Sequence, residues 1–532
     1  MKRIFSLICL MILMTGVSSC LNELDQSPDD SRNTRDAAFA EDAFGTYQGL
    51  IAKIYASLIL TGQEGPAGQG DIVANDEGFT SYIRQYWQVQ ELSTDEAINA
   101  WGDPGVDDIN FNSWGAGNSV VFYMYYRIYF TVSLTNEFIR ESTDEKLASR
   151  NLSDTERAEV IRYRDEARFL RALAYYHAVD LFGNVGFVDD NSPVGFHLPP
   201  RIERADLFNY VESELLELEG SMRAPKSVYG RADQGAAWML LAKLYLNAEV
   251  YTGQNRYTDC LTYVNKVINE GGYSLASDYS NLFKADNNTL NEIIFPIVSD
   301  PLTSQSFGGT TYLVNAQIGG TMTNSDFGVP GGGWGGNRST LALYNTFDDP
   351  SGETDSRAMF WTDGQTLEIS NPRQFTQGVG ITKWKNITSG GESSSNEGGT
   401  FVDTDFPMFR LGDAYLMYAE AVLRGGNGGD LGQAATFINM LRTRAYGDAS
   451  GNISQGDINE DFIIDERARE LYWEAHRRQD LIRFNRYSGN AYSWPYKAGT
   501  RNGAAFDENF ELFPLPPEEL AANPNLKQNT GY

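Results

Sequence analysis

The side chains in this sequence best suited to holding a ligand are aromatic rings on glycine-rich stretches. Aromatic residues make up 13% of the chain, including 29 Tyr and 9 Trp, which is more than a core needs, so we expect some rings to face a ligand. Trp334 lies in the run Gly331–Gly336, where its neighbours offer no side chains to pack it into a core. An exposed indole can stack on the apolar face of a ligand while polar groups nearby bond to the ligand's polar rim. Trp334 is therefore predicted to bind a ligand, with a structural role as the alternative.

Catalytic and metal chemistry have few candidates. The histidines are too few and too scattered for a metal site: His177, His197 and His476. No G-x-S-x-G motif is present, so nucleophilic hydrolysis has no candidate, and we expect no enzyme. A glycosidase needs only two nearby carboxylates, and 71 acidic residues leave that open. No cofactor is expected, although Asp286–Asn288 and Asn75–Glu77 could offer oxygen ligands to a structural Ca²⁺; neither fits an EF-hand, and a solvated loop is the other interpretation.

The first residues are typical of an export signal. Lys2 and Arg3 precede an apolar run that is shorter than a membrane span, so 1–19 is predicted to be a signal peptide. The sequence Val17–Cys20 has the form of a lipobox, which predicts lipidation of Cys20; a secreted protein with a chance cysteine is the alternative. Residues 20–36 are polar and acidic and are predicted to be a lipidated flexible tether.

Charge and cysteine content limit the class of protein further. The formal net charge of −29 disfavours nucleic acid and anionic lipid surfaces as partners. Of the 3 cysteines, Cys9 leaves with the signal and Cys20 carries lipid, so Cys260 remains without an intramolecular partner. Stability must then come from a large buried core, to which Cys260 is expected to belong.

The elements that must position the ligand-binding loops are predicted to be mainly α-helical. Ser153 and Glu156 form a capping box, and apolar residues spaced by three and four follow as far as Phe182, with Gly183 as the stop. Two apolar faces on this helix predict a place between layers. Further helices are expected at 37–60, 118–139, 204–223 and 229–250.

Two segments resemble tetratricopeptide units. Trp238, Leu241 and Tyr245 have the spacing of a first helix, with 257–269 as its partner; the second unit covers 415–445. Such pairs stack because each cannot bury its apolar face alone. The fold is therefore predicted to be tetratricopeptide-like helix pairs in a superhelical body, together with a loop-rich region containing short strands.

Two long stretches between the helices lack helical periodicity. Residues 63–116 are predicted to form long loops, and 276–405 to be mostly loop with short strands. From Glu466 through Asp480 the pattern predicts one continuous, densely charged amphipathic helix, and 512–532 is expected to be extended. The tryptophans in periodic or strand-like contexts are expected in the core: Trp114, Trp238, Trp384 and Trp473.

Several of these motifs, in this order, resemble the SusD/RagB family of outer-membrane lipoproteins. They are EARFLRALAYYHAVDLFG (166–183), GRADQGAAWMLLAKLYLNAEVYTG (230–253), PMFRLGDAYLMYAEA (407–421), ERARELYWEAHRRQDLIRF (466–484) and the Pro-rich end 513–532. The resemblance implies a lipid-anchored protein at the cell surface that binds nutrient oligomers, usually glycans, and passes them to a SusC-like TonB-dependent transporter.

The resemblance also implies binding residues. The segment Glu91–Asp103 is similar to that of a starch-binding family member; Trp101 and Phe307 then fall on stacking positions, and Arg84 on a hydrogen-bonding arginine. Two residues depart from that pattern: Asn99 replaces a tryptophan, and Phe307 lacks a phenol hydroxyl, which puts starch specificity in doubt. Asn99 and Asp103 are candidate partners for a hydroxyl rim.

Three functions follow as hypotheses. The first is capture of an oligo- or polysaccharide, such as starch or another glucan, for the transporter. The second is peptide binding in the same fold, and the third is glycoside hydrolysis. In each case we expect a helical body at 37–275 with N-terminal binding loops, a ligand-binding region at 276–405, and helices of the same globular unit at 406–532.

Overall fold

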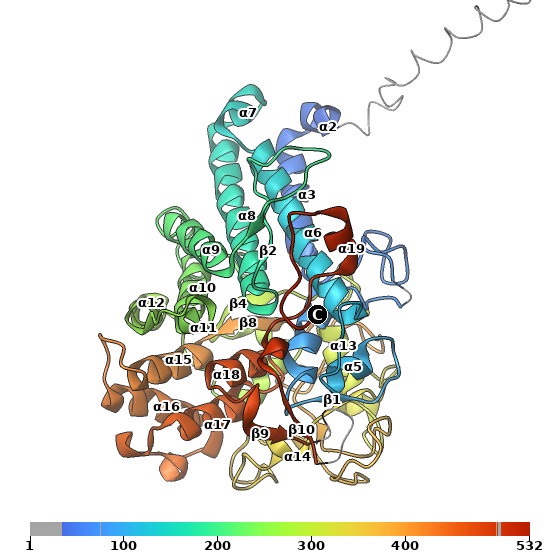
Figure 1. Ribbon diagram of the computed structural model, residues 1–532, viewed down its shortest axis with the longest axis vertical. Coiled ribbons are helices and arrows are strands. Elements are labelled where there is room, and N and C mark those ends of the chain that lie inside the picture. The colour runs from blue at the N-terminus through green and yellow to red at the C-terminus, as the bar shows by residue number, and fades with distance from the viewer. Residues whose placement is uncertain (1–34, 75, 496, 498–501) are drawn as a thin grey trace, which may run out of the picture.

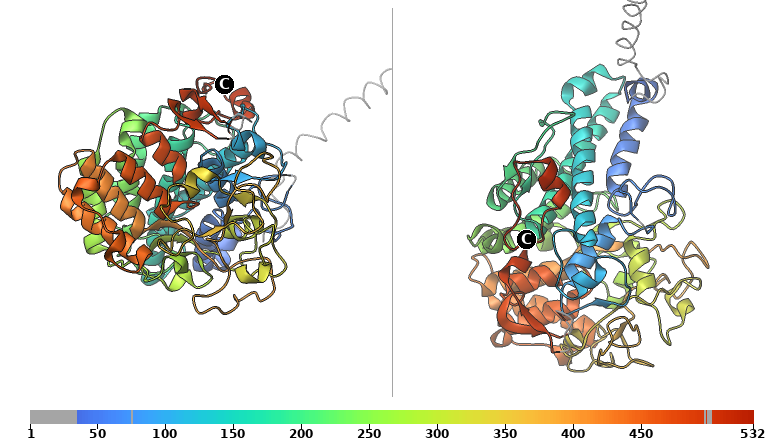
Figure 2. Two further views of the ribbon diagram at one scale, coloured as in Figure 1. Left: turned by 90° about the horizontal axis from the view of Figure 1, so that it is seen from below. Right: turned by 45° about the vertical axis from the view of Figure 1, so that its right-hand side comes forward.

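The computed structural model describes residues 35–74, 76–495, 497 and 502–532 (Figure 1). It is mainly helical with short strands, as the sequence predicts, and the structure shows these strands paired two by two. The helices gather on one side of the molecule and the loop-rich segments on the other, with β4 and β8 between them (Figures 1 and 2). Signal peptide 1–19 and Cys20 lie outside the described residues, as does all of the tether except Arg35 and Asp36. The predicted divisions at 275 and 405 stay predictions.

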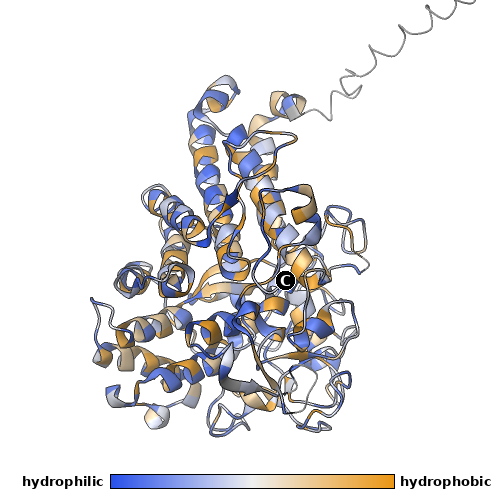
Figure 3. Ribbon diagram, viewed as in Figure 1, coloured by the Kyte–Doolittle hydropathy of each residue, from blue (hydrophilic) through white to orange (hydrophobic). Residues whose placement is uncertain are grey.

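Helices that follow one another in sequence pack side by side and form the helical stack. Its members are α6 (Ser119–Glu141), α8 (Asp154–Leu181), α9 (Arg204–Leu218), α10 (Gln234–Leu246), α12 (Tyr257–Glu270), α15 (Leu411–Leu423) and α16 (Leu431–Tyr446). The two predicted tetratricopeptide units are the pairs α10/α12 and α15/α16, and α12 packs directly on α15. Burying the apolar face of each pair against the next is what stabilises such a stack. Figure 3 shows apolar and polar positions alternating along these helices.

The longest helix, α8, begins and ends where the sequence predicts. Ser153 caps it, and Glu156 closes the capping box by accepting from the Ser153 backbone N–H at 2.8 Å. Its second half is buried on every side, because α6, α9 and α3 (Ala43–Ala56) pack against it. Gly183 follows in the left-handed region at φ +69, where a side chain would be strained.

The loop-rich region leaves and rejoins the helical stack at one point. Strand β4 (Ile293–Ile297) pairs antiparallel with β8 (Phe406–Arg410), so the chain between them is a large closed insertion. Within the insertion lie α13 (Gly309–Ala316), α14 (Leu341–Tyr344), β5 (Asn337–Arg338), β6 (Phe360–Trp361), β7 (Gly380–Ile381) and the 3₁₀ turn η5 (Asn324–Phe327). β6 pairs with β7, whereas β5 pairs outside the insertion with β1 (Ile98–Asn99).

The prediction of long loops over 63–116 is wrong in part. The helix α4 (Tyr82–Trp87) continues into the π-helical turn η2 (Gln88–Leu92), and the two form one buried helical segment. A further helix, α5 (Val106–Asn110), follows β1. Every residue of α4 and η2 is buried, polar ones included. A helix surrounded by protein needs no apolar stripe, so it shows no helical period in the sequence.

The predicted continuous helix from Glu466 to Asp480 is broken. α17 (Glu460–Leu471) ends before Trp473 and Ala475, which have φ of +62 and +64, and α18 (Arg477–Arg483) begins after them. The break is stabilised from outside, because the Trp87 indole donates to the Trp473 carbonyl at 3.1 Å and the Glu91 carboxylate accepts from the Ala475 N–H at 2.6 Å. Arg477 forms an ion pair with Asp95, which lies outside α17 and α18. The charges are buried contacts between segments, not a solvated helix face.

Further elements complete the described chain. They are α2 (Arg35–Glu41), α7 (Asp144–Ser149), α11 (Ala248–Thr252), η3 (Tyr279–Phe283), η4 (Asn287–Thr289), η6 (Ala449–Gly451), η7 (Gln455–Asp457), η9 (Glu508–Glu511), α19 (Pro517–Ala522) and the strand pairs β2 (Val185–Gly186) with β3 (Arg201–Ile202) and β9 (Gly489–Trp494) with β10 (Ala504–Phe506). The end expected to be extended thus includes one short helix, α19.

The expected core residues are confirmed. Cys260 is fully buried, and the four tryptophans assigned to the core are also buried: Trp114, Trp238, Trp384 and Trp473. None of the helices in the described part of the chain is both long enough and apolar enough to cross a membrane.

Candidate functional site

The β1–β5 ladder brings together two tryptophans that are far apart in the sequence. Asn99 of β1 lies opposite Asn337 of β5, and the Ala100 N–H donates to the Gly336 carbonyl at 2.9 Å. Trp101 and Trp334 follow at the same end of this ladder, with ring centroids 6.4 Å apart. The Trp101 indole N–H donates to the Trp334 carbonyl at 3.1 Å, which fixes one ring against the other segment.

These two rings line a cavity of about 530 Å³, referred to below as the aromatic cavity. Its lining is Asp76, Glu77, Arg84, Trp101, Gly102, Asp103, Phe307 and Trp334. The Phe307 ring lies 6.4 Å from that of Trp334, so three half-buried rings share one hollow. Five of the six residues predicted to bind ligand therefore meet in this cavity, and Asn99 does not.

Asn99 belongs to the support beneath the cavity. It is buried, its amide donates to the Asn337 side chain at 2.6 Å, and its own side-chain oxygen accepts from the Trp101 N–H at 2.7 Å. The expectation that Asn99 meets a hydroxyl rim is wrong, because its hydrogen-bonding groups are already used inside the protein. Its strand position turns it inward, while Trp101 two residues later lies at the cavity.

Arg84 reaches the cavity from the buried helix α4. Its side chain is 3% exposed, and its guanidinium lies 4.7 Å from the Tyr312 ring and 5.8 Å from the Trp101 ring. One guanidinium nitrogen pairs with the Asp76 carboxylate at 3.2 Å. Tyr312, on α13, also packs edge-on to Trp101 at 5.9 Å and was missed by the sequence reasoning, because it lies within an ordinary apolar helix.

Two of the three carboxylates at the cavity, Asp76 and Glu77, come from a loop between Thr61 and Thr80, here called the 61–80 loop and described at every position except 75. Gly78 allows the loop to approach Phe307 closely: at φ +77, a Cβ here would come within 2.4 Å of the Phe307 backbone. Only glycine permits so close an approach. Asp76 and Glu77 are thereby held beside the Phe307 ring.

The lining of the aromatic cavity is acidic. Asp76, Glu77 and Asp103 face it with Arg84 as their cationic counterpart among the lining residues. Partial burial raises the pKa of Asp76, although Arg84 lowers it and Asp103 raises it further. From the sequence, Asp76 and Glu77 are predicted to belong to a possible calcium loop and not to the ligand site. No pattern in the sequence marks them as cavity residues, because their position depends on contact with Phe307.

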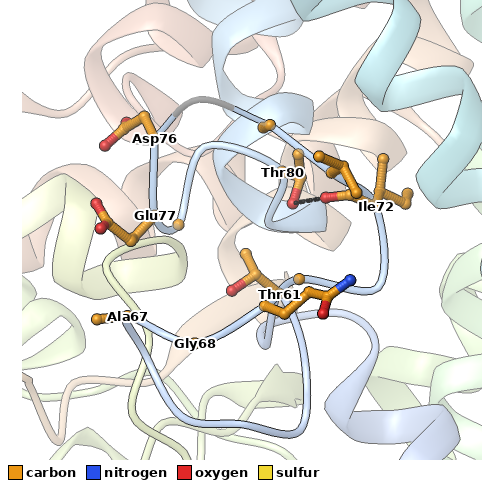
Figure 4. Close-up of a pocket in the computed structure, with 12 residues that line it drawn as sticks. Thr61, Ala67, Gly68, Ile72, Asp76, Glu77 and Thr80 are labelled. Atoms are coloured by element: carbon orange, nitrogen blue, oxygen red, sulfur yellow. Dashed lines mark hydrogen bonds between the residues drawn. The ribbon is translucent and has the colours of Figure 1, made fainter.

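A second, smaller cavity of about 220 Å³ lies within the 61–80 loop (Figure 4). Asp76 and Glu77 line both cavities, so the two share a wall. Figure 4 shows Ala67 and Gly68 on one side of this side pocket, with Ile72 and Thr80 across from them.

The possible calcium loops receive no support from the geometry. The Asp286 carboxylate accepts from the Ser389 backbone N–H at 2.8 Å, and Asn287 is buried and bonds to the Asp405 backbone. Asn75 lies outside the described residues. Across the positions that the structure describes, no three His, Cys, Asp or Glu side chains are grouped so as to hold a metal ion.

The fold and the cavity are those of a helical-repeat protein with an aromatic, acidic cavity at its surface. Comparison with known proteins is consistent with this class. The model of the SusD family matches residues 271–532. The starch-binding protein SusD of Bacteroides thetaiotaomicron is 34% identical over 100% of this chain and 99% of its own. The chain belongs to the SusD family.

Other relatives and structures agree with the assignment. A SusD-like protein of Bacteroides ovatus is 28% identical over 60% of this chain and 59% of its own. A SusD superfamily structure from Parabacteroides distasonis covers 92% of this chain and 99% of its own, with a TM-score of 0.70 at 20% identity. The surface glycan-binding protein A of Bacteroides thetaiotaomicron, solved with laminarihexaose, covers 91% and 99%, with a TM-score of 0.66 at 20% identity.

Proposed function

We propose that this protein captures a neutral oligo- or polysaccharide of the starch type at the cell surface and passes it to a SusC-like TonB-dependent transporter. The observation that carries the proposal is the gathering of Trp101, Trp334 and Phe307 around one cavity of about 530 Å³. Rings spaced by 6.4 Å can each stack on the apolar face of a sugar unit. Starch is favoured among glycans because the relative with 34% identity over the full chain is a starch-binding protein.

The charges of the cavity favour a neutral ligand. Asp76, Glu77 and Asp103 can accept hydrogen bonds from sugar hydroxyls, and Arg84 can donate them. A glycan that carries carboxylates or sulfates would meet three like charges in a partly buried site. Neutral glucans are therefore expected to bind more tightly than anionic polysaccharides.

Binding can be tested with the purified protein from residue 21 onward in native gels that contain soluble starch, mannan or pectin. We expect retardation by starch and none by pectin. A reducing-sugar assay on the same protein tests the hydrolase alternative, and titration with mixed peptides tests the peptide alternative. Sugar release, or retention by peptides alone, would contradict the proposal.

The transporter and the membrane anchor are parts of the same proposal. Cys20 would carry the lipid, and the chain would lie at the outer surface of the outer membrane. Detergent extracts should then yield the protein together with an outer-membrane transporter, and Cys20→Ala should release it from the membrane fraction. Membrane association that survives Cys20→Ala would refute the lipid anchor.

A further inference from the structure

The side pocket within the 61–80 loop is a built feature that the linear stacking site does not use. Its side-chain lining is polar at Thr61, Gln69 and Thr80, in addition to the two shared carboxylates. None of its lining residues is aromatic. In Figure 4 the loop runs around the pocket, and the carboxylates of Asp76 and Glu77 turn away from Thr80 and Ile72.

The floor of the side pocket is held by Arg127 of α6. This arginine is fully buried; it donates to the Thr61 carbonyl at 2.8 Å and to the Thr80 hydroxyl at 3.2 Å, and also bonds to the Thr80 carbonyl. The two ends of the loop are therefore tied to one side chain. Asp71 closes the loop on itself, because its N–H donates to the Thr61 carbonyl at 2.7 Å. Thr61 and Thr80 are both buried, so the pocket is closed at this end.

The size and the lining restrict what the side pocket can hold. At about 220 Å³ it has less than half the volume of the aromatic cavity and room for about seven water molecules at roughly 30 Å³ each. A polysaccharide chain cannot pass through a pocket that is closed at one end. With no ring to stack on, a guest must be held through its own hydroxyl groups. These can donate to carboxylates and backbone carbonyls, and can both donate to and accept from a threonine hydroxyl. A single sugar unit that branches from a chain meets these conditions.

We propose that the side pocket binds a single-sugar branch of the glycan whose main chain stacks on Trp101 and Trp334. This inference rests on the proposed function. The shared wall of Asp76 and Glu77 places the branch point at the boundary of the two cavities. A branched α-glucan therefore gains hydrogen bonds that a linear chain of the same length cannot form.

The experiment compares two probes by calorimetry: linear maltoheptaose, and maltoheptaose carrying one α-1,6-glucosyl branch. We expect the branched probe to bind roughly tenfold more tightly, about 1.4 kcal/mol, as one or two net hydrogen bonds would provide.

Ala67→Trp places a ring in the pocket mouth and should reduce this preference to less than about threefold. Gln63→Trp is the matched control, because it adds the same side chain to an exposed position of the same loop outside the lining. Gln69→Ala, which removes a polar lining group, should lower the preference by a smaller factor.

The outcomes separate this inference from the proposed function. If the wild-type protein binds linear maltoheptaose but shows no preference for the branch, the function stands and the branch pocket is refuted. An Ala67→Trp variant that keeps the full preference, or that weakens both probes equally, also refutes it. If neither probe binds, the starch-type function fails and the branch pocket fails with it.

Discussion

Trp334→Ala tests most directly whether the aromatic cavity binds sugar by stacking. Trp334 is preferable to Trp101, because the Trp101 indole N–H holds the Trp334 backbone carbonyl and its loss would disturb the site itself. That carbonyl remains in Trp334→Ala. The ring of Trp334 is half-buried and lines the aromatic cavity, so part of it is accessible to a ligand.

The expected loss follows from the area that a ligand would cover. A tryptophan side chain can bury about 150–250 Å², and a stacked sugar covers one face, about 80–100 Å² of apolar surface. At about 25 cal/mol per Å² this is about 2–2.5 kcal/mol, or roughly thirty- to sixtyfold in affinity. Losses of this size are typical of a central aromatic anchor.

Calorimetric titration with maltoheptaose measures this loss, and Trp361→Ala is the matched control. Trp361 is also a half-buried tryptophan of the loop-rich region, but its indole donates to Thr321 at 3.0 Å and it does not line the aromatic cavity. We expect Trp361→Ala to leave the affinity within twofold. Equal losses in the two variants, or none in Trp334→Ala, would refute the stacking argument.

Two further predictions concern stability. Burial raises the pKa of Glu96 from its usual 4.5 to about 8, although Arg477 lowers it, so the folded protein keeps a proton that the unfolded chain releases. The free energy of unfolding should therefore fall as pH rises from 4.5 to 8, by at most about 1.4 kcal/mol per pH unit. Urea melts at several pH values measure this dependence, and the free energy of unfolding of Glu96→Gln should fall less steeply with pH than that of the wild type. An identical dependence on pH in the two proteins would contradict this. Arg127→Met should lower stability by about 3 kcal/mol, because it removes the side-chain donor to the Thr80 carbonyl and one of the two donors to the Thr61 carbonyl, and should speed proteolysis of the 61–80 loop. Arg140→Met, on the same helix but partly exposed, is the control and should change stability by less than about 1 kcal/mol.

Local sequence patterns predicted the helices whose caps and apolar stripes are encoded within one segment. Ser153 and Glu156 define the start of α8 by contacts three residues apart, and the α10/α12 and α15/α16 pairs show their repeat spacing. The same reasoning failed between Leu471 and Arg477. There the helix is broken by contacts with residues 87–96, which lie nearly 400 positions earlier in the chain. The hydrogen bond from Trp87 to Trp473, for example, joins residues that are 386 positions apart. A single-segment pattern contains no information about such partners.

Some residues of the candidate site could likewise be identified from the sequence, whereas the position of others depends on distant contacts. Trp334 could be recognised from its glycine-rich surroundings, and Trp101, Arg84 and Phe307 from family resemblance. Neither source indicated that Asn99 turns inward, because the direction of a side chain on β1 depends on its register with β5.

The helical-repeat body, the family, and the residue types that can stack on sugars are all predictable from the sequence, because they depend on composition and on contacts within a few turns. Three features are visible only in the folded protein: Trp101 and Trp334 share one cavity, Asp76 and Glu77 form its acidic wall, and Arg127 closes a pocket beside it. These depend on contacts between segments distant in the chain, which form only when the β1–β5 ladder and the 61–80 loop are packed on α6 and α13. The lining of the aromatic cavity therefore comes from the packing of separate segments and not from any one motif.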